Sequence, residues 1–385
     1  MSTNLLEITA RKRRDPFAVA DPADFEFLEG PDIDPQAVIT NPLISLYCLD
    51  HANQRALFVE TTPGVDLSQS PFLYQAQYEN TVRLIGVPYE TLHDLVRGIS
   101  LDEQKLILVY SVGRTGSTLL GAALNAVEGI VGLSEPDVFT QLVALREWDG
   151  SNDAEFSALV ESCMKFLCKP TEQTPDPRGW VIKFRSFAIE LGDLLYKHFP
   201  NTKNIFLYRN AEAWLNSQLR VFGDTEGDIG FRTWAQGWFS TLVPAVAEYV
   251  RTGGPLLTYP SLFTKLWLNT LERYMSLHSA GMPGLAIRYE DMKASPHETL
   301  QKIFEYCDLP MKNMDAVYQV LEKDSQAGSG MSQEALRHKI SGLTDAQWAD
   351  LFRELQAHPT IQSPDFILPG TWMPTTQLQS KRRVS

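Results

Sequence analysis

The clearest chemical signal in this sequence is LILVYSVGRTGSTLL, residues 106–120. A short apolar run leads into a loop of small residues with two glycines, and Thr118–Val127 is typical of the beginning of a helix. A strand that turns through small residues into a helix presents backbone N–H groups and the positive end of the helix dipole. Arg114 adds a full positive charge and a planar set of donors, and Ser117 adds a hydroxyl. The segment predicts a site for phosphate or sulfate; a turn that serves packing alone stays open as the alternative.

The loop departs from the phosphate-binding loop of ATP- and GTP-dependent enzymes. That motif ends in Gly-Lys followed by Ser or Thr. Here Gly116 is followed by Ser-Thr, and the cation Arg114 lies two residues before this glycine. A kinase or hydrolase would also need an Asp for Mg²⁺, and neither Asp50 nor Asp137 ends a suitable strand. We keep a nucleotide-dependent kinase or hydrolase as an alternative function.

A second segment, HFPNTKNIFLYRNAEAWLNSQLR (198–220), repeats the pattern of a strand followed by a helix. The predicted strand runs to Tyr208, Arg209 follows it, and a helix begins at Ala211. Ser217 lies eight residues after Arg209, about two helical turns further on. The two side chains can therefore serve one anion, or Arg209 can simply make a surface ion pair.

A third segment, LSEPDVF (133–139), places Glu135 at the end of a short apolar piece. A carboxylate at a strand end can act as a general base. The alternative is that Glu135 caps the helix that follows, because acidic residues favour first helical turns. Asp137 and Glu128 are its local competitors as a base.

The chain around these segments alternates between strands and helices from residue 105 onward. Its predicted strands are Leu106–Tyr110, Trp180–Phe184, Ile205–Tyr208 and Leu285–Arg288, and its predicted helices are 117–127, 137–147, 153–168, 188–199, 211–222, 262–278, 296–307 and 345–356. Such alternation predicts a parallel sheet covered on both faces, with ligands at the carboxyl ends of its strands. Arg114, Lys183–Arg185 and Arg209 all follow or end such strands.

The first hundred residues follow a different pattern. Residues 1–35 are rich in Asp and Pro with weak periodicity and indicate an irregular arm. Residues 43–60 predict two strands around a polar turn, and residues 71–98 have helical spacing. We expect this region to form an N-terminal cap on the main domain.

Composition narrows the class of protein. A chain of 385 residues with 44% hydrophobic residues can bury a sizeable core, and a net charge of −13 argues against a nucleic-acid surface. No apolar run is long enough to span a bilayer, and no secretory signal begins the sequence. Four cysteines without metal spacing indicate buried thiols in a reducing compartment. We therefore expect a cytoplasmic protein without nucleic-acid or membrane partners.

Taken together, the three segments resemble the sulfotransferases that use 3′-phosphoadenosine-5′-phosphosulfate (PAPS). The resemblance spans roughly residues 105–310, and its spacing is closest to the tyrosylprotein and bacterial small-molecule branch. RYEDMKASPHETLQKIFEYCDLP (288–310) is similar to the strand–helix segment that follows in many members. The resemblance implies an α/β fold with a P-loop NTPase-like parallel sheet flanked by helices. We expect a sulfotransferase domain over 101–385 and an N-terminal α+β cap over 1–100.

The resemblance also assigns roles to individual residues. The loop that holds the 5′-phosphosulfate corresponds to Gly113, Arg114, Thr115, Gly116, Ser117, Thr118 and Leu119. Arg209 and Ser217 match the pair that binds the 3′-phosphate. Glu135 lies 21 residues after Arg114, as the catalytic acid–base does in the tyrosylprotein branch, and Lys183 lies 26 residues before Arg209, where that branch has a lysine that stabilises the sulfuryl group.

The implied activity is transfer of the sulfuryl group from PAPS to a hydroxyl or amino group of a small-molecule acceptor, with PAP as product and no metal. Two departures from the family pattern stand out. Arg185 lies near the position where the cytosolic branch has a histidine, and the C-terminal Arg-Lys-Gly motif is absent, with KDSQAGSG (323–330) as a plausible substitute. A PAP-binding protein without catalysis stays open as an alternative. Four aromatic residues either line an acceptor cleft or fill the core: Trp214, Phe231, Trp234 and Trp238.

Overall fold

The computed structural model describes residues 2–13, 18–170, 175–312, 314–321, 332, 334–339 and 341–375. The chain forms two compact units, and each unit is built from two stretches of sequence. The first comprises Met1–Leu106 and Val127–Thr202, and the second comprises Ile107–Ala126 and Lys203–Ser385. The domain boundary that the sequence suggests near residue 100 stays a prediction.

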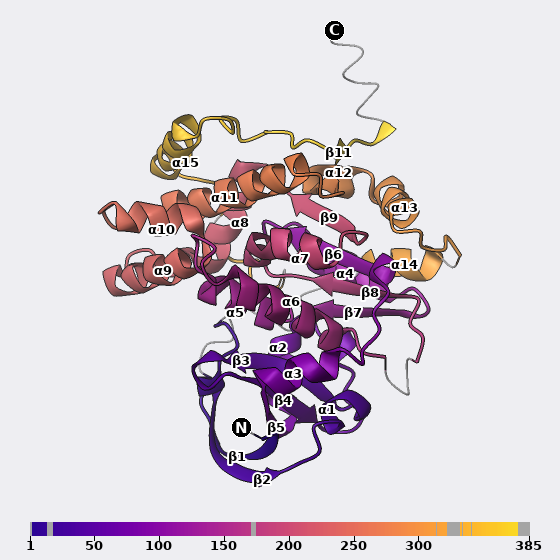
Figure 1. Ribbon diagram of the computed structural model, residues 1–385. Coiled ribbons are helices and arrows are strands. Elements are labelled where there is room, and N and C mark those ends of the chain that lie inside the picture. The colour runs from indigo at the N-terminus through magenta and orange to yellow at the C-terminus, as the bar shows by residue number, and fades with distance from the viewer. Residues whose placement is uncertain are drawn as a thin grey trace. The chain divides into compact units, whose positions relative to one another are not determined.

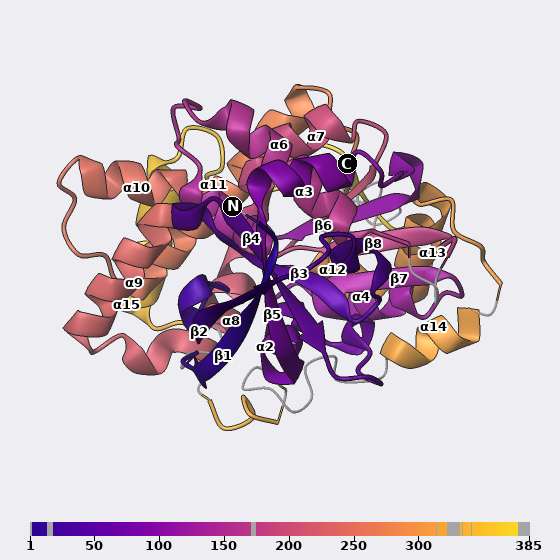
Figure 2. The ribbon, with the colours of Figure 1, turned by 60° about the horizontal axis from the view of Figure 1, so that its bottom comes forward.

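An antiparallel five-stranded sheet begins the first unit (Figure 2). In the order β2-β1-β5-β4-β3, its strands are β1 (Asn4–Arg11), β2 (Phe25–Asp32), β3 (Ile44–Asp50), β4 (Arg55–Thr61) and β5 (Thr81–Pro88). The two strands predicted within residues 43–60 are confirmed as β3 and β4. The irregular arm predicted for residues 1–35 is wrong, because β1 and β2 pair along most of their length.

The helices α2 (Leu73–Asn80) and α3 (Tyr89–Val96) flank β5, so the helical interpretation of residues 71–98 is only partly correct. Strand β5 pairs with β1 on one side and with β4 on the other. These two partners override the local helical spacing, as tertiary context commonly does. A short helix, α1 (Ala37–Thr40), precedes β3.

The first unit continues with two parallel strands and the helices that flank them. The strands are β7 (Ile130–Ser134) and β8 (Gly179–Lys183), and the helices are α5 (Val138–Leu145), α6 (Asp153–Leu167) and α7 (Gly192–His198). The predicted helix 188–199 is divided in the structure, because a 3-10 helix (Ser186–Leu191) comes before α7. The Gln141 side chain of α5 bonds to both backbone groups of Leu49, at 2.6 and 2.7 Å. These two hydrogen bonds connect α5 to the edge strand β3 of the antiparallel sheet.

The second unit contains four parallel strands in the order β11-β10-β9-β6. They are β6 (Leu106–Ser111), β9 (Lys203–Tyr208), β10 (Leu285–Arg288) and β11 (Thr371–Trp372). The helices of this unit are α4 (Ser117–Asn125), α8 (Ala211–Phe222), α9 (Ile229–Leu242), α10 (Pro244–Arg251), α11 (Tyr259–Ser279), α12 (Tyr289–Ala294), α13 (Pro296–Tyr306), α14 (Met314–Leu321) and α15 (Asp345–Ala357). The long, largely buried α11 packs against α8, α10 and α15 (Figure 1).

The predicted α/β fold, with parallel strands flanked by helices, is confirmed. Strand β6 is buried at every position, which is why it reads as a continuous apolar run. Ser111 at its end pairs with Leu207, near the end of β9. In the first unit, Ser134 at the end of β7 pairs with Lys183 at the end of β8. Each pairing places the carboxyl ends of two neighbouring strands side by side, so the residues that follow these strands come close together.

Within the part of the chain described here, no helix has the length and apolar character needed to cross a membrane.

Candidate functional site

The loop between β6 and α4 has an unusual backbone. Gly113, Arg114 and Gly116 all have positive φ angles, of 78°, 54° and 74°. Glycine adopts this region at little cost, whereas arginine rarely does. A Cβ at Gly116 would lie 2.7 Å from Cε of Met292. The turn therefore favours glycine at this position for its φ angle, while the Met292 methyl, at the end of a flexible side chain, can shift to make room.

The first turn of α4 has properties of an anion site. Gly116 occupies the N-cap position, and no side chain caps the helix among the described residues. The N–H groups of Ser117, Thr118 and Leu119 begin the helix and have no partner within it. The Thr115 hydroxyl is buried and forms no hydrogen bond within the described chain. Buried polar groups are normally paired, so these donors indicate a place for an anionic ligand.

Three of the predicted nucleotide-binding residues contact one another in the second unit. The Arg114 Nε donates a hydrogen bond to Ser217 Oγ at 3.2 Å. A terminal nitrogen of Arg209 donates to the Arg114 carbonyl at 3.3 Å. Helix α8, which carries Ser217, is tied to the loop by Trp214, whose indole N–H donates to the carbonyls of Val112 and Gly113. The structure thus brings the loop, the end of β9 and α8 together.

Arg209 is held in place by an aromatic ring. Its guanidinium lies 4.6 Å from the ring centroid of Tyr289, and its Nε lies 3.9 Å from a carboxylate oxygen of Glu290. Burial lowers the pKa of Arg209, against the opposing effects of Tyr289 and Glu290. That Nε forms no hydrogen bond with any described residue. Tyr289 is not among the residues predicted for the site, although its position directly after β10 was a usable signal.

Glu135 and Lys183 form a pair in the first unit. Glu135 directly follows β7 with a φ of +59°, and its N–H donates to the Lys183 carbonyl at 2.6 Å. The Lys183 ammonium donates to Oε1 of the same carboxylate. The Lys183 side chain is 4% exposed and that of Glu135 is 13% exposed. The predicted base and the predicted sulfuryl-stabilising cation therefore contact each other directly.

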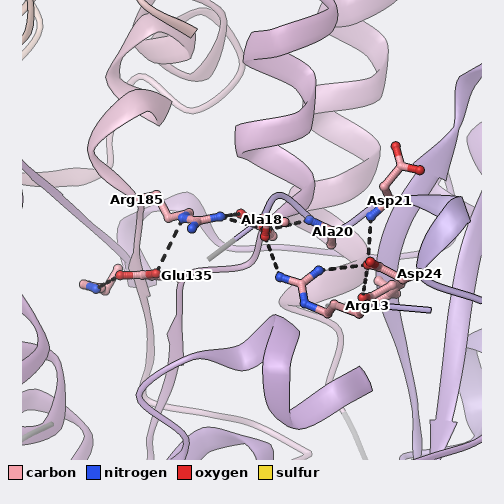
Figure 3. A network of polar contacts seen from close by, with 10 residues as sticks. Arg13, Ala18, Ala20, Asp21, Asp24, Glu135 and Arg185 are labelled. Carbon is pink, nitrogen blue, oxygen red and sulfur yellow. Dashed lines mark hydrogen bonds and ion pairs between the residues drawn. The ribbon is translucent and has the colours of Figure 1, made fainter. Parts of the chain in front are cut away.

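Arg185, the second residue after β8, also approaches the Glu135 carboxylate. Its Nε lies 3.8 Å from Glu135 Oε2, as Figure 3 shows. A terminal nitrogen donates to both oxygens of Asp137, at 2.9 and 3.0 Å. Burial is the largest single effect and would lower the pKa of Arg185, but the charges of Asp137, Tyr74 and Glu135 and the Asp137 hydrogen bond together raise it. Burial raises the pKa of Asp137, while Arg185 opposes that rise.

Asp137 and Glu128 differ from Glu135 in their exposure and in their neighbours. Asp137 is fully buried and both of its oxygens face Arg185, whereas Glu128 lies exposed in the turn after α4. The helix-capping alternative for Glu135 is not observed: Asp137 occupies the N-cap position of α5, and this helix has no side-chain cap among the described residues. Of the three carboxylates, Glu135 combines partial exposure with adjacent cations.

The predicted aromatic residues divide into two groups. Trp214 is fully buried in the core of the second unit, while Trp234 is 51% exposed and Phe231 is 40% exposed on α9. Trp238 stacks on Trp234, with ring centroids 6.1 Å apart. The loop KDSQAGSG (323–330) lies outside the described residues.

No group of three or more His, Cys, Asp or Glu side chains within the described ranges is arranged to hold a metal ion.

Comparison with known proteins identifies one family. A model of the sulfotransferase family matches residues 107–313, more than half of the chain. Among solved structures, the sulfotransferase domain from the curacin biosynthetic pathway is 16% identical, with a TM-score of 0.36, over 72% of this chain and 96% of that one. STF9 from Mycobacterium avium is 13% identical, with a TM-score of 0.41, over 73% and 84%. Mouse SULT7A1 complexed with PAP is 13% identical, with a TM-score of 0.34, over 77% and 94%. No curated protein matches the chain.

Proposed function

We propose that this chain, which belongs to the sulfotransferase family, transfers the sulfuryl group of PAPS to a hydroxyl or amino group of a small, natural-product-like acceptor. One observation carries the proposal: Arg114, in the loop before α4, contacts both Ser217 and Arg209. The loop amides offer one anion position, and Arg209 with Ser217 offers a second. A nucleotide with phosphate at both its 5′ and 3′ positions requires two such positions, and ATP does not.

The residues present fit PAPS. The uncapped first turn of α4 and the buried Thr115 hydroxyl suit the 5′-phosphate. The buried Nε of Arg209, which lacks a hydrogen bond within the described chain, is a donor for the 3′-phosphate. Charge-assisted bonds of this kind are about twice as strong as neutral ones.

Each catalytic residue has a distinct role in the proposal. PAPS supplies an electrophilic sulfur whose bond to the phosphate oxygen breaks as the acceptor bonds to sulfur. Arg114 and Lys183 neutralise the negative charge that grows on the oxygens around that sulfur. Glu135 accepts the proton that the acceptor loses. The order and spacing of the motifs along the chain assign these groups to one reaction.

The test is an assay of PAP release from PAPS with a panel of hydroxylated and amino small molecules. The proposal expects release that depends on the acceptor, together with a sulfated product detected by mass spectrometry. Glu135→Gln keeps the side-chain shape and should lower turnover by roughly 10²–10⁴-fold with PAP affinity near wild type. PAP binding without turnover for any acceptor would favour a non-catalytic binding protein, and consumption of ATP in place of PAPS would favour the kinase or hydrolase.

We also propose that the reaction takes place in the cytoplasm, because all four cysteines are free and buried and free thiols are typical of a reducing compartment.

A further inference from the structure

Arg185 is held on several sides by residues of the first unit. Its side chain is 10% exposed and bonds to both oxygens of Asp137. Its guanidinium carbon lies 4.9 Å from the ring centroid of Tyr74. Its Nε faces Glu135 Oε2 at 3.8 Å, while Lys183 contacts the other oxygen of that carboxylate. The position of Arg185 therefore bears directly on the orientation of the Glu135 carboxylate.

Two of the groups that hold Arg185 depend on the N-terminal sequence, which lies outside the region that matches the family. The Ala20 N–H donates to Asp137 Oδ2 at 2.7 Å. Tyr74, on α2, also lies 4.9 Å from the guanidinium of Arg13. The N-terminal region thus reaches the Glu135 carboxylate through two routes, one by Ala20 and Asp137 and one by Tyr74, each by way of Arg185.

The N-terminal contacts are themselves fixed by further bonds, shown in Figure 3. Arg13 is 2% exposed at its side chain and pairs with Asp24 at 2.8 Å. Asp24 also accepts from the Tyr47 hydroxyl at 2.6 Å and from the Asp21 N–H at 3.1 Å. Buried ion pairs contribute little net stability compared with apolar residues of the same volume, and their best-supported use is to specify one arrangement. A network of this kind is suited to setting the position of a side chain.

We propose that Tyr74 and Asp137 are positioning residues that hold Arg185 against Glu135, so that the N-terminal region completes the catalytic half of the first unit. The inference rests on the proposed function for its catalytic consequence. Arg185 and Lys183 then hold one oxygen each of the Glu135 carboxylate. Loss of the Tyr74 ring leaves the Arg185 guanidinium without its aromatic neighbour and lets the carboxylate turn away from the acceptor.

The chain offers a matched control on the same helix. Tyr78 lies one turn after Tyr74 on α2 and has a guanidinium, that of Arg11, 5.4 Å from its ring centroid. Tyr74→Leu removes a ring that lies beside Arg13 and Arg185, and Tyr78→Leu removes a ring on the same helix that lies beside Arg11. Tyr74→Phe keeps the ring and should behave like wild type. Asp137→Asn tests the second route and serves if Tyr74→Leu does not fold.

Two readouts are measured on the full chain. The first is the NMR signal of the Arg185 Nε–H group, assigned by its loss in Arg185→Lys. The second is the kcat and KM for PAPS and acceptor, with the PAP affinity from calorimetry. We expect Tyr74→Leu and Asp137→Asn to shift or broaden the Arg185 signal and to lower kcat by up to about 10²-fold, the effect of misplacing a catalytic group by about 1 Å. PAP affinity should stay within about twofold, because the residues that hold PAP belong to the second unit.

An unchanged Arg185 signal in both Tyr74→Leu and Asp137→Asn would overturn the inference, whatever their activity. Equal losses of kcat in Tyr74→Leu and Tyr78→Leu would also overturn it, since a general loss of stability would then explain both. If wild type neither binds PAP nor uses PAPS, the proposed function fails. The NMR comparison would still decide whether Tyr74 and Asp137 position Arg185.

Discussion

Discrimination between PAP and 5′-AMP tests the nucleotide site most directly. Arg209→Met removes the guanidinium and keeps an unbranched side chain able to lie on Tyr289. Ser217→Ala removes a single hydroxyl from α8. The two nucleotides differ only in the 3′-phosphate, so their affinity ratio isolates the residues that contact it.

The expected magnitude follows from the state of each side chain in the free protein. Arg209 is already largely buried against Tyr289, and its Nε forms no hydrogen bond among the described residues. A phosphate therefore gains a charge-assisted bond of about 1.5–3 kcal/mol, which corresponds to roughly 10- to 150-fold in Kd. The Ser217 hydroxyl already accepts a hydrogen bond from Arg114 at 3.2 Å. When the phosphate binds, the hydroxyl exchanges this partner for the phosphate. Its loss should cost only about 1 kcal/mol, roughly fivefold.

The assay is isothermal titration calorimetry of PAP and 5′-AMP on wild type and both variants. Arg251→Met, which removes an exposed arginine paired with Glu248 on α10, is the control. We expect Arg209→Met to weaken PAP binding and to leave 5′-AMP binding unchanged. Equal affinities of wild type for the two nucleotides, or equal losses of both in Arg209→Met, would refute the assignment of a 3′-phosphate site.

Three further predictions concern the loop, the catalytic cations and a buried lysine. Gly116→Ala and Gly253→Ala should each destabilise the protein by roughly 1–2 kcal/mol in urea unfolding, because both positions have φ near +75°, which strains alanine. The Met292 methyl that lies 2.7 Å from a Cβ at Gly116 is the end of a flexible side chain and can shift, while a Cβ at Gly253 meets nothing within 4 Å. A much larger loss in Gly116→Ala would contradict this. Arg114→Ala and Lys183→Ala should retain PAP binding within about tenfold and lower turnover by roughly 10²-fold or more, because both cations meet charge that grows in the transition state; normal turnover in either variant would remove its role. Lys169 donates to the carbonyls of Val38, Asn41 and Ile44, and burial lowers its pKa to about 8. Between about pH 8 and the ordinary lysine pKa, the unfolded chain binds more protons at Lys169 than the folded chain does. The free energy of unfolding therefore rises with pH across that window, by about 1.4 kcal/mol per unit of pKa shift. The difference in free energy of unfolding between wild type and Lys169→Met should grow in favour of wild type over the same range, and a constant difference would contradict the shifted pKa.

The parallel strands were the most predictable part of the fold. Leu285–Arg288 and the helix 211–222 match the observed β10 and α8, and β6 extends its prediction by one residue. Buried parallel strands consist of apolar residues at successive positions, so local composition is enough to find them. Strand β7, with the sequence IVGLS, was noticed only as a short apolar piece before Glu135, because five residues are too few to show a period.

The strands β1 and β2 were missed for a different reason. Strand β2 is an edge strand whose charged residues face solvent, and only Phe25 among its eight residues is buried. Such a strand lacks the alternation of apolar and polar residues that identifies a half-buried one. Its identity as a strand comes from pairing with β1, which local sequence cannot show.

The contacts of the candidate site also differ in how far the sequence could predict them. Arg114, Arg209 and Ser217 follow strands or lie two turns into a helix, so their proximity could be inferred from strand order and spacing. The contacts of Arg185 with Asp137 and Tyr74 could not be inferred this way. Tyr74 lies 111 residues from Arg185 and Ala20 lies 117 residues from Asp137, and only the folded N-terminal region brings them there.

The interleaving of the two units along the chain has a consequence for synthesis on the ribosome. Strand β6 opens the second unit, but its partner β9 follows about a hundred residues later, after the second stretch of the first unit. At roughly 5–20 residues per second, the nascent β6 waits on the order of ten seconds for β9. Throughout that time the backbone groups on the side of β6 that β9 later covers can pair with strands of a neighbouring nascent chain. We therefore expect the yield of soluble protein to depend on chaperones and to rise when translation of residues 112–202 is made faster by synonymous codons.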